Sequence, residues 1–283
     1  MRGIMLMATG FFLFSGVDTV AKFLTDGLHP VQIVWSRQLG MCLGVFILIA
    51  FKGRSVLKSV NPTLQISRGV LAAISATLFI VAVTYIPLAD AVAITFVAPF
   101  MVTILGALIL REAVGWRRWT AVTVGFIGTL IVMRPGLGVM HPAAFLLIFA
   151  AAAFALRQVF SRLLAGEDKT QTTVAYTAIV STGLLTIPLP FFWQTPTGSQ
   201  IGLLVLIAIV AAVAETLIIM ALDAAQAVVL APVHYSLLLW GTLYGFFVFG
   251  QLPDGWTWIG TAIDVASRIY TLNRERIAAR KQG

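Results

Sequence analysis

Long apolar segments, most of them close to 20 residues, occupy nearly the whole of this 283-residue chain. A helix needs roughly 17 to 25 mostly apolar residues to cross the hydrocarbon core of a bilayer. Sorting the sequence on that criterion predicts ten helices, near 3–24, 30–51, 66–86, 88–110, 116–133, 142–164, 171–193, 200–222, 226–249 and 256–273. Runs such as LIFAAAAFAL are continuous rather than alternating, which favours helices over barrel strands. The chain is therefore predicted to be an all-α polytopic membrane protein.

Composition agrees with this class. Hydrophobic residues make up 59% of the chain and charged residues only 11%, against roughly 25% charged in soluble domains. The net charge of +8 does not indicate nucleic-acid binding, because the basic residues stand between the apolar segments, where they orient helices in a bilayer. The apolar run after Arg2 continues to Asp18 without a small-residue cleavage site, so we interpret it as a retained first helix and not as a signal peptide.

The basic residues also predict a topology. Placing the amino terminus in the cytoplasm assigns all but three of the 19 Lys and Arg residues to the cytoplasmic side, the exceptions being Lys22, Arg37 and Arg134. Arg68 is among those assigned to that side. Such a bias predicts that both termini are cytoplasmic.

An internal repeat is indicated by two similar stretches, REAVGWRRW at 111–119 and GQLPDGWTW at 250–258. Glu112 and Gln251 occupy matching places, 139 positions apart. An odd number of spans in each copy would invert the second copy, which explains why only the first, cytoplasmic stretch keeps its arginines. The predicted domains are two five-helix repeats, residues 1–135 and 136–283, the second with a basic cytoplasmic tail.

The sequence also resembles a known family. The stretches TYIPLADAVAITFVAPFMVTILGALILREAVGWRRW and ALDAAQAVVLAPVHYSLLLWGTLYGFFVFGQLPDGWTWIG look like the paired halves of EamA proteins, in the drug/metabolite transporter superfamily. LHPVQIVWSRQLG and APVHYSLLLWGTLYG are similar to its bacterial riboflavin-transporter-like branch. The resemblance covers nearly the whole chain and implies a bacterial inner-membrane protein with ten helices around a central cavity. Gln251 departs from the family, which usually has an acidic residue there.

Polar and ionisable side chains within the predicted spans are the first candidates for a transport site. A central Arg, Lys or Asp costs about 2.5 to 3.5 kcal/mol to insert, so each needs a partner or a wet cavity. The predicted substrate-binding residues are Asp18, Trp35, Arg37, Arg157, Gln158, His234 and Tyr235. For Asp18, Arg157, Gln158 and His234, structural pairing or packing is the alternative.

Two of these residues have specific alternatives. The guanidinium of Arg37 either binds a carboxylate or phosphate or locks the second helix to Asp18. Asp18 and Lys22 are four positions apart and share a helix face, so a local ion pair is also feasible. Trp35 either forms an aromatic wall for a planar solute or packs at the interface.

Glu215 and two prolines are candidates for coupling and for conformational change. Glu215 lies in a long apolar run, where desolvation favours an uncharged carboxyl, and it is the predicted proton-coupling residue. A neutral carboxyl bonded to a helix neighbour is the alternative. Pro99 and Pro232 each remove a backbone donor and are predicted to kink their helices.

Catalytic and cofactor signatures do not occur in the sequence. The single Cys42 and three separated histidines form no metal-ligand pattern, and HExxH, GxSxG and Walker-type motifs are missing. No enzyme activity, cofactor or metal is predicted. Asp264 and Arg268, four apart in the last predicted span, are expected to face lipid, a neighbouring helix or a second copy in a homodimer.

The leading hypothesis is a secondary transporter that moves a small organic metabolite, with riboflavin-like, amino-acid-like and nucleoside-type solutes all open. The two inverted repeats would expose a midplane cavity alternately to either side, with proton coupling through Glu215. The alternative is a lipid or lipid-linked-metabolite flippase of the same fold, with a lateral opening toward the membrane lipids.

Overall fold

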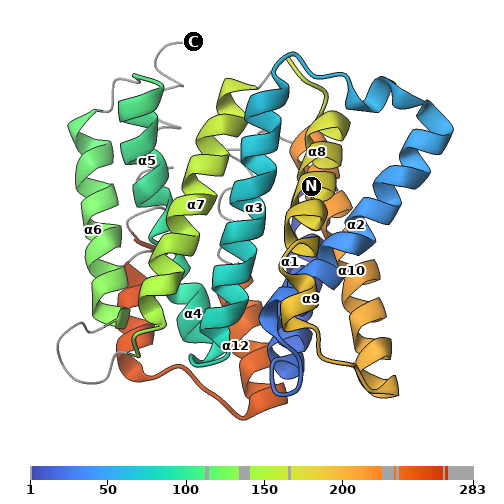
Figure 1. The fold of residues 1–283 in the computed structure, drawn as a ribbon. Coiled ribbons are helices and arrows are strands. Elements are labelled where there is room, and N and C mark those ends of the chain that lie inside the picture. Colours follow the sequence, from blue (N-terminus) through green and yellow to red (C-terminus); the bar gives the residue numbers. More distant parts are fainter. Residues whose placement is uncertain are drawn as a thin grey trace.

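The computed structural model describes residues 2–111, 115–133, 141–164, 167–224, 233, 236–263 and 265–266. All regular elements in these ranges are helical (Figure 1). They are α1 (Arg2–Leu24), α2 (Pro30–Lys52), the 3₁₀ turn η1 (Arg54–Leu57), α3 (Pro62–Val83), α4 (Leu88–Thr95), α5 (Ala98–Ile109), α6 (Trp116–Met133), α7 (Ala144–Leu163), α8 (Thr170–Thr186), α9 (Leu189–Phe192), α10 (Gly198–Ala224) and α12 (Ser236–Phe249). Residues 255–263 are also helical.

Six helical segments are long and apolar enough to cross a membrane. They are α1, α2, α3, Leu88–Ile109, α7 and the Gly198–Ile218 part of α10. Shorter apolar helices cover Thr123–Met133 and Ser236–Phe249. The predicted all-α membrane class is confirmed. The count of ten spans stays a prediction, because parts of the ninth and tenth predicted spans lie outside the described residues.

Local sequence sets the ends of the first helices. His29 is the N-cap of α2, where its Nδ1 accepts a hydrogen bond from the Val31 N–H (3.3 Å). Asn61 caps α3 in the same way, its Oδ1 accepting from the Leu64 N–H (3.2 Å). Gly53 ends α2 with a φ of 73°, a conformation that favours glycine. These caps satisfy backbone donors that a helix start leaves unpaired.

The predicted span at 88–110 is interrupted. Phe96 and Val97 form a turn between α4 and α5, and Pro99 lies in the first turn of α5. A proline nitrogen cannot donate to the carbonyl four positions earlier, so this part of the chain cannot continue as one regular helix. The interruption places a break part-way along a span.

Hydrogen bonds between loops show which helix ends lie together. Asp168, between α7 and α8, accepts from the Val60 N–H just before α3 (2.8 Å). At the opposite end, Gln194, between α9 and α10, exchanges two hydrogen bonds with the side chain of Gln32 near the start of α2 (2.9 and 3.0 Å). We name these the Asp168 end and the Gln194 end of the bundle.

The helices of the two halves consequently run in opposite directions. Because α1 ends at the Gln194 end and α7 at the Asp168 end, these two helices are antiparallel, and so are α2 and α8, and α3 and α10 (Figure 1). Each helix also packs against the counterparts of its own neighbours in the other half. Thus α1 packs on α10 and α12, and its counterpart α7 packs on α3 and α5; α2 packs on α10, and its counterpart α8 packs on α3.

A shared apolar core joins the two halves, and a second apolar surface faces outward. The core includes side chains of both halves that are at most 1% exposed, such as Val17, Val34, Ile80, Leu147 and Ile207. Large apolar side chains are also strongly exposed, among them Phe51, Leu108, Phe149, Phe191 and Phe247. An apolar outer surface of this extent is unfavourable in water and suits contact with lipid.

Candidate functional site

An ion pair lies inside the first half. The Arg37 Nη1 donates to the Asp18 carboxylate across 3.1 Å, and Asp18 is only 7% exposed. The guanidinium also lies over the ring of Phe14, 4.3 Å from its centroid. The predicted lock between the second helix and Asp18 is confirmed. Lys22 makes a different contact from the one considered, since its Nζ donates to the Ile86 carbonyl (2.7 Å).

Arg68 is a buried residue that the charge pattern does not single out. The pattern places it on the cytoplasmic side; because α3 begins four residues earlier than expected, Arg68 lies further inside the helix and is 8% exposed. Its Nε donates to Ser161 Oγ of α7 (2.8 Å), and its Nη1 donates to Gln65 and Thr177 (3.2 and 3.5 Å). Three helices therefore hold this guanidinium.

Arg157 of α7 is partly buried and has fewer hydrogen-bond partners. Its guanidinium lies over the ring of Phe154, 5.0 Å from the centroid. Its Nε is buried and has no hydrogen-bond partner among the described residues. The adjacent backbone is tied in, because Ser161 Oγ donates to the Arg157 carbonyl (2.8 Å) while accepting from Arg68. The position of the helix is fixed, but part of the guanidinium is left unsatisfied.

Electrostatic interactions extend this group into the second half. The carboxylate of Glu215 in α10 attracts the guanidinium groups of Arg157 and Arg68, and Arg37 repels that of Arg157. With a rise of 1.5 Å per residue, Asp18 and Arg37 lie about 10 Å from the Gln194 end, while Arg68 and Arg157 lie about 10 Å from the Asp168 end. We name these five residues the ionic centre. Their place within apolar spans makes them the best candidate for a polar solute path.

The other predicted residues lie elsewhere or outside the described ranges. Trp35 Nε1 donates to Thr186 Oγ1 of α8 (2.9 Å), and the ring packs against the main core. Gln158 is exposed, whereas its neighbour Arg157 is partly buried. The remaining predictions, which are His234, Tyr235, Pro232, Asp264 and Arg268, lie outside the described residues. Clusters of three or more metal-ligating side chains are not found in the described part of the chain.

A polar network closes the Asp168 end between the two halves. The carboxylate of Asp168 accepts from Ser59 Oγ, from the Val60 N–H and from Gln65 Nε2. Burial acts to raise the pKa of Asp168, but these three hydrogen bonds outweigh it and hold the pKa below its usual value. Gln65 continues the network to Arg68, so the loop contact is connected to the ionic centre.

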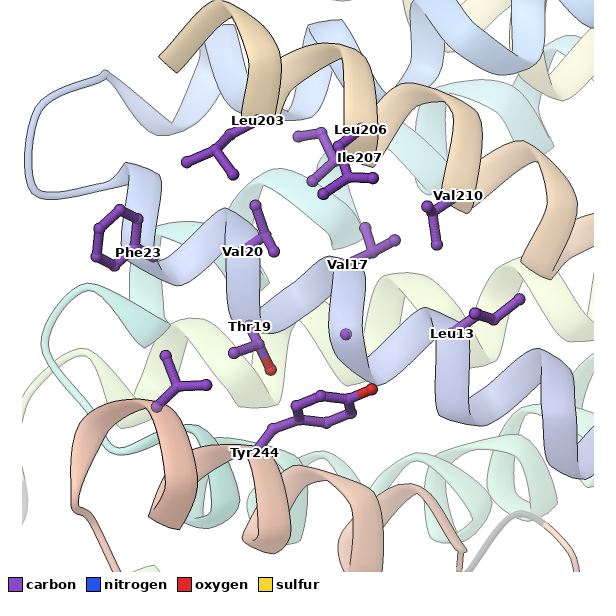
Figure 2. A pocket seen from close by; sticks show the side chains of 12 residues that line it. Leu13, Val17, Thr19, Val20, Phe23, Leu203, Leu206, Ile207, Val210 and Tyr244 are labelled. Atoms are coloured by element: carbon purple, nitrogen blue, oxygen red, sulfur yellow. The ribbon is translucent and has the colours of Figure 1, made fainter. Parts of the chain in front are cut away.

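A cavity of about 380 Å³ lies between α1, α10 and α12 (Figure 2). Its walls are almost entirely aliphatic, and the polar atoms that Figure 2 shows there are the hydroxyls of Thr19 and Tyr244. Several lining side chains are also exposed on the outer surface, including Phe23 (53%) and Val248 (50%). We name this space the lateral crevice. Its composition is suited to an apolar chain and not to a polar solute.

Aromatic side chains of α1 and α12 gather beside the crevice. Phe12 of α1 meets the edge of Trp240 with ring centroids 5.1 Å apart, and it lies 5.6 Å from the ring of Tyr244. Trp240 Nε1 is buried without a hydrogen-bond partner in the described part of the chain. In the sequence, Phe12 and Thr19 lie seven positions apart and Trp240 and Tyr244 lie four positions apart, so each pair shares a helix face. These spacings are the sequence signals for this group.

The helical bundle, its lipid-compatible surface and the charged side chains within its apolar spans define a multi-pass membrane protein. Comparison with known proteins agrees: residues 1–134 match the EamA-like transporter family. A riboflavin transporter of Vibrio cholerae is 30% identical over 100% of this chain and 96% of its own length. The chain belongs to the EamA-like transporter family.

Other relatives carry different names. An S-adenosylmethionine uptake transporter of Rickettsia felis is 25% identical over 96% of this chain and 95% of its own length. A pseudopaline exporter of Pseudomonas aeruginosa is 26% identical, with 94% of each chain covered. One solved crystal structure covers 97% of this chain and 98% of its own, with 19% identity and a TM-score of 0.66, which indicates a shared fold. The relatives are named for both uptake and export and for different solutes.

Proposed function

We propose that this protein is a secondary transporter that moves a small polar organic metabolite by exposing the ionic centre alternately to each side of the membrane. The observation that carries the proposal is the place of Asp18, Arg37, Arg68, Arg157 and Glu215 within apolar spans of both halves, where Asp18 and Arg68 are buried and the other three are partly buried. Charges in such places are expensive and rare, and they typically mark the path of a polar solute or ion. Transporter-named relatives over nearly the whole chain support the same class.

The arrangement of the halves supports an alternating mechanism. Counterpart helices run antiparallel, and the helix contacts are exchanged between the halves, as expected for repeats related by an axis in the membrane plane. Polar loop contacts at the Asp168 end and at the Gln194 end give each end its own closure. Rocking of one half against the other would open one closure while the other stays shut.

The orientation we propose places the Asp168 end in the cytoplasm of a bacterium, with the chain in the inner membrane and both termini cytoplasmic. Exposed basic residues support this, since Lys52, Arg54, Lys58 and Lys169 all lie at that end. Short cytoplasmic loops of bacterial membrane proteins carry such an excess of Lys and Arg.

Lipid handling is the second candidate, and the lateral crevice is the observation that favours it. The crevice is aliphatic and its rim is exposed on the outer surface. An acyl chain could occupy such a space while its headgroup followed a polar path. Liposomes containing a fluorescent phospholipid and an impermeant reductant test this candidate: protein-dependent loss of inner-leaflet fluorescence would favour it over solute transport.

Solute uptake into proteoliposomes tests the main proposal. Labelled flavins, amino acids and nucleoside-type metabolites are offered with and without a pH gradient, and at least one class is expected to accumulate only when the protein is present. Glu215→Gln is expected to remove gradient-driven accumulation and to spare exchange, because the proton carrier is lost. Thr216→Val, on an exposed neighbouring position, is the matched control. If no class is transported, the transport function is rejected. If Glu215→Gln behaves like its control, proton coupling through Glu215 is rejected.

A further inference from the structure

Positive and negative charges do not balance in the part of the ionic centre formed by Arg68, Arg157 and Glu215. Asp18 and Arg37 neutralise each other through their ion pair. Among the described residues, Glu215 is the acid that interacts with Arg68 and Arg157, so one positive charge of this group is in surplus when Glu215 is ionised. In a low-dielectric interior an uncompensated charge is strongly unfavourable, so this group is expected to attract a monoanion.

Arg68 and Arg157 differ in how many of their N–H donors already have hydrogen-bond partners. The Nε and Nη1 donors of Arg68 are directed at Ser161, Gln65 and Thr177. Arg157 has a buried Nε with no partner in the described part of the chain, and its guanidinium is backed by the ring of Phe154. Leaving a charged donor buried and unsatisfied costs more than leaving a neutral one. Arg157 therefore offers an incoming acceptor both a positive charge and a buried N–H donor that has no partner among the described residues.

We propose that Arg157 binds a carboxylate group of the transported solute. Arg68 stays bonded to Ser161, Gln65 and Thr177 and adds positive charge, and Glu215 cancels one of the two positive charges. This inference rests on the proposed transport function and specifies its substrate class as monoanionic. A guanidinium presents parallel N–H donors that match a carboxylate, and one carboxylate balances one surplus charge. A phosphate monoester would bring more charge than the centre can neutralise.

Binding of benzoate and of its neutral isostere benzamide to the full-length protein in lipid nanodiscs tests the proposal. Benzoate is expected to bind the wild-type protein at least about tenfold more tightly, the factor that corresponds to one charge-assisted hydrogen bond. Arg157→Gln is expected to abolish this preference, and Arg157→Lys to restore part of it. Arg162→Gln, an exposed arginine on the same helix, is the control and should keep the preference.

A second measurement separates a binding role from a structural one. Because Arg157 is incompletely paired, Arg157→Gln is expected to leave thermal stability unchanged or to raise it. Equal binding of both probes to the wild-type protein, or a preference that survives Arg157→Gln or is lost in Arg162→Gln, would overturn the proposal. In each of those outcomes, continued protein-dependent uptake of a neutral solute would leave the transport function standing, so the two failures are distinguishable.

Discussion

Two seams between the halves use the same packing plan with different chemistry. We name the packing of α3 against α7 and α8 the first seam, and the packing of α10 against α1 and α2 the second seam. Hydrogen bonds cross the first seam, from Arg68 to Ser161, from Ser75 Oγ to the Ala150 carbonyl (2.9 Å) and from Ser181 Oγ to the Gly69 carbonyl (2.9 Å).

The second seam is held mainly by close packing. A side-chain carbon added at Gly10 would meet Ile218 and the Ala214 carbonyl, and one added at Gly40 would collide with the backbone of Ala208. The lateral crevice opens beside this seam. Apolar surfaces slide without breaking directional bonds, whereas buried hydrogen bonds must be replaced as they break. The difference implies that the second seam moves more easily than the first.

The largest effect is expected from breaking the ion pair that joins the two first-half helices of the second seam. Arg37→Ala leaves the Asp18 carboxylate buried and unpaired, and loss of one member of a buried pair typically costs about 3 to 5 kcal/mol. Denaturant unfolding in micelles measures this loss. Replacing both residues with apolar ones, as in Asp18→Leu with Arg37→Met, should recover most of the stability. A single-variant cost below about 1 kcal/mol would show that the pair is solvated.

Glycine substitutions compare the two seams directly. Gly40→Ala is expected to lower the free energy of unfolding by about 1 to 3 kcal/mol, because the added carbon meets rigid backbone of α10. The same change at Gly69 meets the Cβ of Val180, which is fixed to the α8 backbone, and should cost a similar amount. Gly44 has no atom within 4 Å of the added carbon, so Gly44→Ala is the neutral control. Equal effects at Gly40 and Gly44 would contradict the close approach.

Filling the lateral crevice tests whether the second seam must move. Val210→Phe places a ring in the cavity of about 380 Å³, so stability is expected to change by less than about 1 kcal/mol. Transport should nevertheless slow if α10 shifts against α1 in each cycle. Val213→Phe, on an exposed position of the same helix, should leave the rate unchanged. Undiminished transport by a stable Val210→Phe protein would place the motion elsewhere.

The smallest effect on stability is expected from lowering the pH, and the pH at which stability is lost should differ between the two seams. Partial burial lowers the pKa of His29, which caps α2 beside the second seam and stacks on Phe192. A lowered folded-state pKa gives stability that is present above the unfolded value near 6.5 and is lost as the pH falls through the folded value. Protonation also removes the Nδ1 acceptor, whose loss costs about 1 kcal/mol, the usual contribution of an N-cap.

Asp168 at the first seam has a lowered pKa as well, but its contribution is lost only in stronger acid, below the ordinary carboxyl range near 4. Hydrogen exchange between pH 7.5 and 5.5, corrected for the intrinsic rate, should therefore loosen the start of α2 and spare the Ser59 loop. His29→Asn keeps a capping oxygen and cannot titrate, so it should remove the pH dependence. Equal loosening of both regions would refute the assignment.

The sequence predicts the spans well because apolar length is a direct consequence of bilayer thickness. It also identified Asp18 and Arg37 as partners, since charges this deep in apolar segments require one. It does not single out Arg68, which lies near a helix start; the hydrogen bonds that hold it inside the bundle go to Ser161 and Thr177, about a hundred residues away. The crevice could not be foreseen either, because aliphatic residues that line a cavity look like those that face lipid.

Distances across the two ends test the central claim, that the halves rock about the ionic centre, most directly. In a Cys42→Ser background, spin-label pairs at the exposed positions 58 and 169 report on the Asp168 end, and pairs at 26 and 199 report on the Gln194 end. Adding a transported solute, or reversing the pH gradient, should lengthen one distance and shorten the other. Two distances that stay fixed, or that lengthen together, while transport proceeds would contradict the account.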